Sequence, residues 1–261
     1  MSTISVAIIA HNEESCLSHA LESVAWADQI VVVDCGSTDA TPDIARRSCV
    51  ELYGEPNREN LNLNKNIAIE RCTGDWVLIL DADEIVTDLL AGEIRRVIND
   101  PVHDGYLIPR KNYVMGRWLR RGGQYPDYQL RLFRRGQGRF PAQHVHERIA
   151  LNGSVGTLHE SLDHFPYPTI ADLIRKGAFY MEFEAQFLAN SDHQASFGKS
   201  LFYGCFRPWF RFVRRYIFKG GFKDGIPGLT VALFDLWNQT VRWLRLWEIQ
   251  NAEPRAGERK P

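Results

Sequence analysis

The sequence of 261 residues lacks several motifs that would assign a protein to a functional class directly. No Gly-x-Gly-x-x-Gly follows the first apolar run and no Gly-Lys-Ser/Thr occurs, which excludes the common dinucleotide fold and the P-loop. The five cysteines show no Cys-x-x-Cys spacing, so neither a thiolate metal site nor a redox pair is expected. No apolar run approaches the roughly 20 residues that span a bilayer. With a net charge of −1, these absences predict a cytoplasmic protein without a nucleic-acid partner, soluble or peripheral to a membrane.

The sequence does contain apolar runs of strand length that alternate with helical patterns. The runs cover residues 4–10, 29–33, 50–53 and 76–80. This order predicts an α/β protein with a Rossmann-like, mostly parallel sheet and helices on both faces. A helix at 88–98 follows, and shorter strands are then expected at 105–108, 128–133 and 144–149. These strands should extend the sheet and build the second wall of a cleft.

Asp81 and Asp83 stand directly after the run at 76–80, at the carboxyl end of the predicted strand. Open α/β sheets bind ligands at this edge. Two carboxylates there can hold Mg²⁺ or Mn²⁺ and leave positions for phosphate oxygens. The alternative is that they only cap the following turn. Because the strands before His11 and Asp34 also end in polar clusters at this edge, a nucleotide diphosphate site is favoured.

Six motifs, taken together, carry a family resemblance. They are Ile8–Glu14, Val32–Thr41, Leu63–Asn66, Leu80–Glu84, Gln129–Phe133 and Val145–Glu147. The chain resembles the inverting family-2 glycosyltransferases with a GT-A fold, most of all the bacterial subgroup that adds sugars to lipopolysaccharide core and similar glycolipids. The resemblance implies a nucleotide diphosphate sugar as donor, expected to be a UDP-sugar, and a divalent metal cofactor. It also implies a hexose transferred to a lipid-linked saccharide acceptor.

The same resemblance assigns roles to individual residues. Those expected to bind the donor are Ala10, His11, Glu13, Asp34, Asp39, Lys65, Asp81 and Arg131. Asp83 would bind the metal, and His146 matches a family histidine that contacts metal or phosphate. The alternative for His146 is a structural histidine beside a buried strand. The alternative for Arg131 is a position on a solvated edge strand.

Inversion at a sugar carbon is a single displacement, which needs a base to take the proton of the acceptor hydroxyl. Asp127 is the favoured base because it is an isolated acid in a basic segment, and such an acid should have a depressed pKa and be ionised. The family often places two adjacent acids here, whereas this chain has Pro126 before Asp127. Glu147 therefore stays open as the alternative base.

The segment Phe202–Phe218 predicts a helix with two different faces. One face carries the apolar residues Phe202, Phe206, Trp209, Phe210, Val213 and Ile217, and the adjoining face carries Arg207, Arg211, Arg214 and Arg215. Aromatic and basic stripes side by side are typical of a helix that lies on an anionic membrane. The alternative is a core helix whose arginines reach out to solvent. A last amphipathic helix is expected from about Pro227 to Glu248.

These patterns predict a catalytic domain followed by a helical extension. Residues 1–165 would form the GT-A domain, with a donor-binding half at 1–100 and an acceptor half at 101–165. Residues 166–251 would be a C-terminal amphipathic extension that holds the enzyme on the inner face of the cell membrane, and 252–261 a disordered tail. The alternatives are a sugar-phosphate nucleotidyltransferase, which would carry a Gly-rich loop where this chain has His-Asn-Glu-Glu, and a non-catalytic nucleotide-sugar-binding protein.

Overall fold

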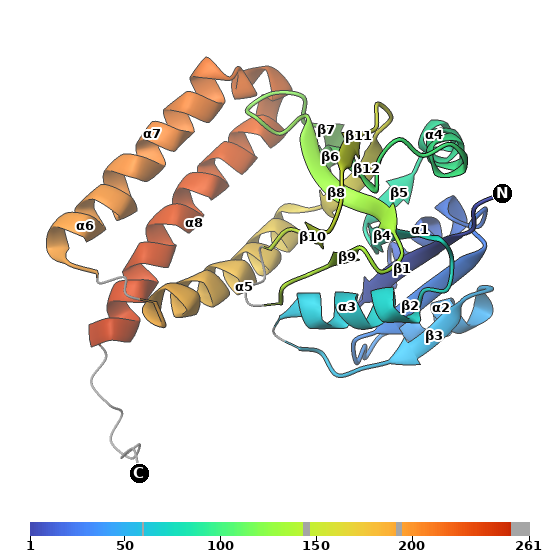
Figure 1. Ribbon diagram of the computed structural model, residues 1–261. Helices are drawn as coiled ribbons and strands as arrows, with labels where there is room; N and C mark the ends of the chain where they lie inside the picture. The colour runs from blue at the N-terminus through green and yellow to red at the C-terminus, as the bar shows by residue number, and fades with distance from the viewer. Residues whose placement is uncertain (59, 143–146, 192–194, 252–261) are drawn as a thin grey trace, which may run out of the picture. The chain divides into compact units, whose positions relative to one another are not determined.

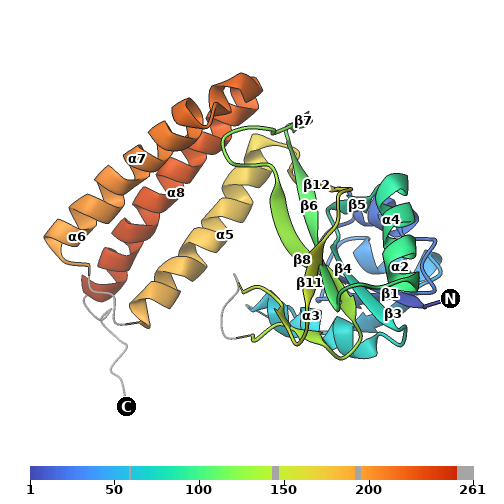
Figure 2. The same ribbon diagram turned by 45° about the horizontal axis from the view of Figure 1, so that its top comes forward.

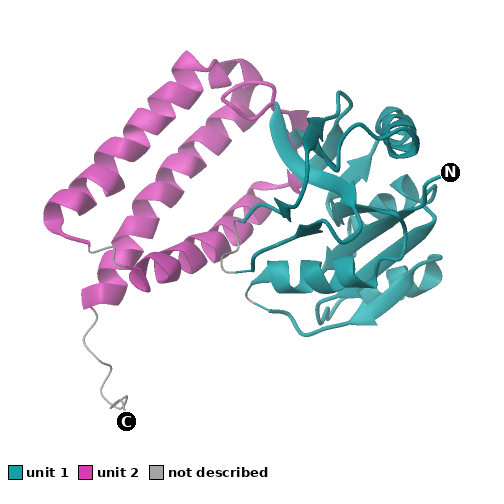
Figure 3. Ribbon diagram, viewed as in Figure 1, with its two compact units in different colours: residues 1–112, 126–165 teal, residues 113–125, 166–261 magenta. Residues whose placement is uncertain are grey.

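The computed structural model describes residues 1–58, 60–142, 147–191 and 195–251 (Figure 1). The expected disordered tail at 252–261 lies outside these residues. The chain divides into two compact units (Figure 3). Unit 1 contains residues 1–112 and 126–165, and unit 2 contains residues 113–125 and 166–261. Whether residues 1–100 bind the donor and 101–165 the acceptor stays a prediction.

Unit 1 holds most of a ten-stranded mixed sheet. Its strands are β1 (Ile4–Ala10), β2 (Gln29–Asp34), β3 (Glu51–Gly54), β4 (Trp76–Asp81), β5 (Glu84–Val86), β6 (Gly105–Val114), β8 (Asp127–Arg134), β11 (Val155–Thr157) and β12 (Leu162–Tyr167). Its helices are α1 (Leu17–Ser23), α2 (Thr41–Arg47), α3 (Leu61–Arg71) and α4 (Asp88–Asn99). The last residues of β6 and β12 are counted in unit 2.

The first four strands are parallel and run in the order β3-β2-β1-β4, as the alternation of strands and helices predicts. The strands β1 and β4 are buried on both faces because alternate side chains enter two separate cores. One core packs under α1, α2 and α4, and the other packs under α3 (Figure 2). The predicted α/β fold with helices on both faces is therefore confirmed.

Beyond β4 the sheet becomes antiparallel, because β8 is inserted between β4 and β6. Strand β8 is thus interior, and Arg131 is only 5% exposed, so the solvated edge strand considered for Arg131 is wrong.

The strand expected at 144–149 is also wrong for its described part. Residues 147–149 are irregular, and Ile149 is buried through side-chain packing without joining a ladder. The neighbouring two-residue strand β10 (Ala150–Leu151) pairs with β9 (Gly138–Arg139) instead.

Unit 2 is mainly helical. Its elements are β7 (Arg117–Trp118), α5 (Ile170–Ala189), α6 (Phe197–Leu201), α7 (Arg207–Val213) and α8 (Gly225–Asn251). Two π-helical turns, Phe202–Phe206 and Arg214–Phe218, flank α7, so the chain is helical from Phe197 to Phe218. None of the helices within the described residues is both long and apolar enough to cross a membrane.

The helices of unit 2 are joined by polar pairs and close aromatic contacts. Helix α5 lies against α8, and Gly177 leaves room there for the ring of Phe234. The ring of Tyr203 stacks on Trp243 of α8 at a centroid distance of 4.7 Å. Arg211 and Arg215 form ion pairs with Asp235 of α8, at 3.0 and 3.3 Å. These two arginines therefore face the bundle, and the prediction that all four arginines of this segment form one outward basic face is wrong.

Candidate active site

The loops after β1 and β2 lie together at the carboxyl edge of the sheet. Ala10 is opposite Asp34 in the parallel ladder, and Asp34 accepts hydrogen bonds from the backbone N–H of Ser37 at 3.3 and 3.4 Å. The Nδ1 atom of His11 is 2.8 Å from the carbonyl oxygen of Cys35. The structure thus brings Ala10, His11 and Asp34 to one place, as predicted for a donor pocket.

Glu13 and Asp39 hold these two loops to each other. The backbone N–H of Glu13 donates to Oγ1 of Thr41 at 2.8 Å. Asp39 accepts from the N–H groups of Thr41 and Glu14, and hydrogen bonds to this carboxylate lower its pKa although burial opposes this. Both residues have a structural role in shaping the wall of the site, and their contact with a donor stays a prediction.

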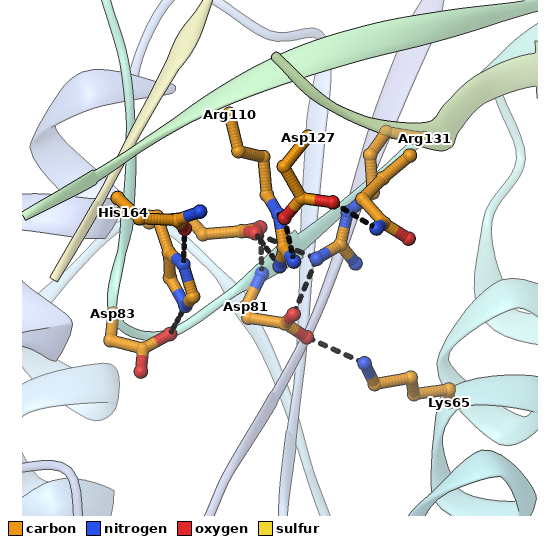
Figure 4. A network of polar contacts seen from close by, with 10 residues as sticks. Lys65, Asp81, Asp83, Arg110, Asp127, Arg131 and His164 are labelled. Atoms are coloured by element: carbon orange, nitrogen blue, oxygen red, sulfur yellow. Dashed lines mark hydrogen bonds and ion pairs between the residues drawn. The ribbon is translucent and has the colours of Figure 1, made fainter. Parts of the chain in front are cut away.

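Asp81 ends β4 between two cations (Figure 4). Its Oδ1 lies 2.6 Å from Nζ of Lys65, which projects from α3, and its Oδ2 lies 2.5 Å from the guanidinium of Arg131 on β8. Burial opposes ionisation of Asp81, but Arg131 and Lys65 outweigh it and hold the pKa of Asp81 well below its ordinary value. Three predicted site residues therefore meet in one ion-pair network.

Through Glu84, the network extends to Arg110 and Asp127, and these last two are labelled in Figure 4. The fully buried Glu84 accepts from Arg131 at 2.6 Å and from Arg110 at 3.1 Å. Two guanidinium nitrogens of Arg110 also donate to Oδ2 of Asp127, at 2.6 and 3.0 Å. Burial raises the pKa of Asp127, but Arg110 and hydrogen bonds to the carboxylate outweigh it, so its pKa lies below the ordinary value. The depressed pKa predicted for Asp127 is confirmed, with Arg110 as its main cause.

Asn112 connects Asp127 to a histidine that the sequence did not indicate. Its side chain hydrogen-bonds Asp127, and because a carboxylate only accepts, the Asn112 amide nitrogen faces Asp127. Its Oδ1 then lies 2.7 Å from Nδ1 of His164, which must carry the proton. Burial lowers the pKa of His164, so the ring is neutral and Nε2 is an acceptor. This Nε2 lies 3.6 Å from Oδ1 of Asp83.

Two acceptors therefore face each other where β4 ends and β12 passes (Figure 4). The separation of 3.6 Å between Nε2 of His164 and Oδ1 of Asp83 is too long for a hydrogen bond, and two lone pairs repel. A cation bound to both atoms would remove this repulsion. Within the described ranges no group of three or more His, Cys, Asp or Glu residues could hold a metal. A metal here would need oxygen ligands from substrate or water as well.

Two predicted residues remain, Glu147 and His146. Glu147 is half-buried, and its Oε2 lies 3.5 Å from Nδ2 of Asn62 at the start of α3. His146 lies outside the described residues, so its role as a metal ligand stays a prediction. The residues that sequence reasoning missed are Glu84, Arg110, Asn112 and His164. Of these four, only Glu84 stands in a motif that the sequence analysis used, because it directly follows Asp83 in Leu80–Glu84.

Replacing Arg131 by Met should destabilise the fold. The change leaves the buried Glu84 and Asp81 without their shared cation, so we expect the free energy of unfolding to fall by about 3–5 kcal/mol. The matched control is Arg134→Met on the same strand. Its side chain is 42% exposed beside Asp104, so the loss should be about 1 kcal/mol or less. Urea unfolding of both variants measures the difference, and equal losses would contradict a structural role for Arg131.

Comparison with known families decides the class of this site. The sequence model of "Glycosyl transferase family 2" matches residues 5–154, which include the ends of β1, β2 and β4 and the whole of β8. The chain belongs to this glycosyltransferase family. It is therefore a nucleotide-sugar-dependent enzyme, and the network at the end of β4 is its candidate active site.

Individual relatives agree with this assignment. The chain is 30% identical to "Lipopolysaccharide core biosynthesis glycosyltransferase LpsC" of Rhizobium meliloti over 239 residues, covering 88% of this chain and 86% of that protein. It is 28% identical over 246 residues to "Uncharacterized glycosyltransferase RP128" of Rickettsia prowazekii, covering 87% and 82%. The resemblance to the lipopolysaccharide-core subgroup is thus confirmed.

A solved structure shows the same fold. The crystal structure of S. aureus TarS 1–349 in complex with UDP-GlcNAc aligns with a TM-score of 0.51 and 19% identity, covering 94% of this chain and 83% of that one. At this identity the likeness concerns the fold alone. It supports the predicted GT-A fold, with a mixed sheet, flanking helices and a C-terminal helical region.

Proposed function

We propose that this glycosyltransferase moves a hexose, with inversion, from a UDP-sugar to a lipid-linked saccharide such as lipopolysaccharide core. The observation that carries the proposal is that Arg110 holds Asp127 in the same ion-pair network as Asp81, which keeps the pKa of Asp127 below its ordinary value. The relative LpsC, a lipopolysaccharide core biosynthesis glycosyltransferase, supports the choice of acceptor, and the TarS complex with UDP-GlcNAc supports the choice of donor. Family membership argues against the nucleotidyltransferase considered from the sequence.

A divalent cation, Mg²⁺ or Mn²⁺, fits the residues at the end of β4. Asp83 and Nε2 of His164 would hold it, since these two side chains face each other across 3.6 Å. Oxygen and imidazole ligands suit Mn²⁺, and Mg²⁺ is commonly bound by one or two protein ligands plus substrate phosphates. When bound, the cation would neutralise charge on the departing nucleoside diphosphate. His146 is the other proposed ligand.

Other residues of the site would accept the proton and bind the donor. Asp127 accepts the proton of the acceptor hydroxyl while that oxygen attacks the anomeric carbon. Its Oδ2 pairs with the charged Arg110, whereas Oδ1 accepts from the neutral amide of Gln129 at 2.9 Å. We therefore assign proton transfer to Oδ1. Asp81, with Ala10, His11 and Asp34 at the neighbouring strand ends, would hold the nucleoside part of the donor.

Replacing Arg110 by Met should move the acid limb of the pH–kcat profile to higher pH. In the native site Arg110 keeps the pKa of Asp127 low, so the base stays ionised until the pH falls through that low value. Without the guanidinium, burial raises the pKa of Asp127, so Asp127 becomes protonated and activity is lost at a higher pH. Arg110→Lys retains a positive charge and should keep the limb close to its native position. Profiles between about pH 4 and pH 8 that coincide for Met and Lys would contradict this role.

The proposal is tested with a panel of donors and acceptors. The protein is incubated with UDP-, GDP- and ADP-sugars, Mn²⁺ or Mg²⁺, and detergent-solubilised rough lipopolysaccharide or lipid-linked saccharides. We expect release of nucleoside diphosphate and a mass increase of one hexose on the acceptor, with a UDP-sugar as the preferred donor. Release of pyrophosphate, or transfer to soluble sugars only, would contradict the proposed reaction or the proposed acceptor.

We also propose that the enzyme works at the inner face of the cell membrane, where a lipid-linked acceptor would be reached. Five of the six apolar residues predicted for one face of Phe202–Phe218 are exposed. They are Phe202, Phe206, Trp209, Phe210 and Ile217. Such a face beside basic side chains supports an interfacial role. It is inconsistent with a core helix, the alternative considered from the sequence.

A further inference from the structure

Unit 2 exposes far more large apolar side chains than unit 1. Among the described residues, 24 large hydrophobic side chains are exposed, and 18 of them belong to unit 2. A soluble domain scatters such residues singly, whereas their concentration in one part of a chain marks an interaction surface. The surface of unit 2 therefore needs a partner.

The longest exposed stripe runs along α8. Its members share one helix face and are Ile226, Leu233, Trp237, Leu244 and Trp247, with exposed fractions between 42% and 75%. Their spacings of seven, four, seven and three residues keep them in line over about 30 Å. The opposite side of α8 packs inward through the buried Ala232, Trp243 and Leu246. The sequence predicted an apolar side for this helix, and the structure leaves much of it uncovered.

Three charged residues of α8, Asp235, Arg242 and Arg245, lie away from this stripe, whereas the exposed Glu248 lies beside it and pairs with Arg245. Asp235 pairs with Arg211 and Arg215, at 3.0 and 3.3 Å. On the α5 side, Arg245 pairs with Glu182 at 2.8 Å, and Arg242 pairs with Glu184. These partly exposed ion pairs join the helices of unit 2, whereas the apolar stripe of α8 lies on a different side of that helix.

The charge on the outer surface selects one kind of partner. The segment 197–223 contains seven basic residues and no acid. Five of the seven are exposed: Lys199, Arg207, Arg214, Lys219 and Lys223. A second copy of the chain docked on this surface would bring like charges together, which disfavours it. An anionic lipid surface complements the charge and also accepts tryptophan and phenylalanine side chains at the headgroup boundary.

From these observations we propose that unit 2 inserts the apolar stripe of α8, with the exposed aromatic face of 202–218, into the surface of an anionic bilayer. This inference depends on the proposed function only where it assumes that the enzyme meets a lipid-linked acceptor at the membrane. Attachment is then mainly hydrophobic, with Arg207 and Arg214 contributing the salt-sensitive part. It should persist at 1 M NaCl, where the Debye length of about 3 Å screens surface charges.

Co-sedimentation with phosphatidylcholine and phosphatidylcholine–phosphatidylglycerol vesicles tests this. The stripe variant carries Leu233→Gln, Trp237→Gln and Leu244→Gln, and the matched control carries Leu89→Gln, Val102→Gln and Val155→Gln, three exposed apolar residues of unit 1. We expect the unmodified chain and the control to stay bound to anionic vesicles at 1 M NaCl. The stripe variant should lose about tenfold or more in partitioning at any salt concentration. Equal binding by stripe variant and control, or complete release of the unmodified chain by salt, would overturn the proposal.

Two further measurements distinguish a loss of lipid binding from misfolding and from self-association. Circular dichroism melting shows whether the stripe variant is folded, and size-exclusion chromatography with light scattering gives the oligomeric state. A dimer that the stripe variant breaks, without vesicle binding, would show that a second copy covers the stripe and would overturn the proposal. Transfer to a detergent-solubilised acceptor should be equal in the stripe variant and the control. Vesicle binding by a chain that transfers no sugar would overturn the proposed function and leave this inference standing.

Discussion

Asp127→Asn should abolish sugar transfer while the enzyme still binds its donor. Asparagine keeps the shape of the side chain and can accept from Arg110, but it cannot take up the proton of the acceptor hydroxyl. A positioned general base contributes about 10²–10⁴-fold to a rate, so kcat should fall by about that factor. Single-turnover transfer measures the chemical step, and calorimetric titration with the donor measures binding.

Glu147→Gln is the matched control for this result. Glu147 lies beside Asn62 at the start of α3, and its amide variant should transfer sugar at a rate close to that of the unmodified enzyme. Normal transfer by Asp127→Asn together with loss in Glu147→Gln would assign the base to Glu147. Loss of donor binding in Asp127→Asn would mean that this carboxylate acts in the donor pocket instead.

Asp83→Asn should lower both donor affinity and turnover. A diphosphate placed beside Asp81 and Asp83 without a cation faces like-charge repulsion, and the amide is a poor ligand for the cation that would relieve it. We expect kcat/KM to fall by about 10²–10³-fold, and the dependence of donor binding on Mn²⁺ to be lost. Calorimetric titration of the donor with and without Mn²⁺ measures this directly.

His164→Ala should reproduce the metal-binding part of this defect, because Nε2 faces Asp83 across 3.6 Å. Asp100→Asn, which removes an exposed acid after α4, is the control and should leave metal and donor binding unchanged. Mn²⁺ affinity can be followed by electron paramagnetic resonance without any turnover. If chelation of the metal leaves donor affinity and turnover unchanged, Asp83 has another role.

The sequence predicted the part of the site that local patterns encode. Parallel strands ending in polar residues placed Asp34 and Asp81 at one edge, and the ladder between β1, β2 and β4 brings them there. The resemblance to the family added Lys65 and Arg131, which meet at Asp81. Whether these residues bind the donor stays a prediction, because the network gives Arg131 a structural role as well.

The rest of the site depends on antiparallel pairing that the sequence did not specify. Arg110 lies opposite Asp127 because β6 and β8 pair in that register, past an irregularity at Tyr106 and Leu107. His164 reaches Asp83 because β12 pairs with β5. Neither register follows from the short, Gly- and Pro-rich pattern of residues 101–165, so Arg110 and His164 could not be singled out among the other basic residues and histidines.

The helical extension shows a similar limit. Periodicity predicted amphipathic helices but not which apolar face the fold would cover. In α8 the covered face is built from small residues and from Trp243 and Leu246, and the larger stripe through Trp237 is exposed. The pairing of Arg211 and Arg215 with Asp235 required knowledge of which helices pack together.

The configuration of the transferred sugar tests the central claim most directly. If Asp127 is the base of a single displacement, the new glycosidic bond must have the opposite anomeric configuration to the bond in the donor. Proton NMR of the purified product reads this from the coupling of the anomeric proton. We predict a β-linked hexose from an α-linked UDP-sugar. A product that retains the α configuration would contradict both the direct displacement and the role of Asp127 as its base.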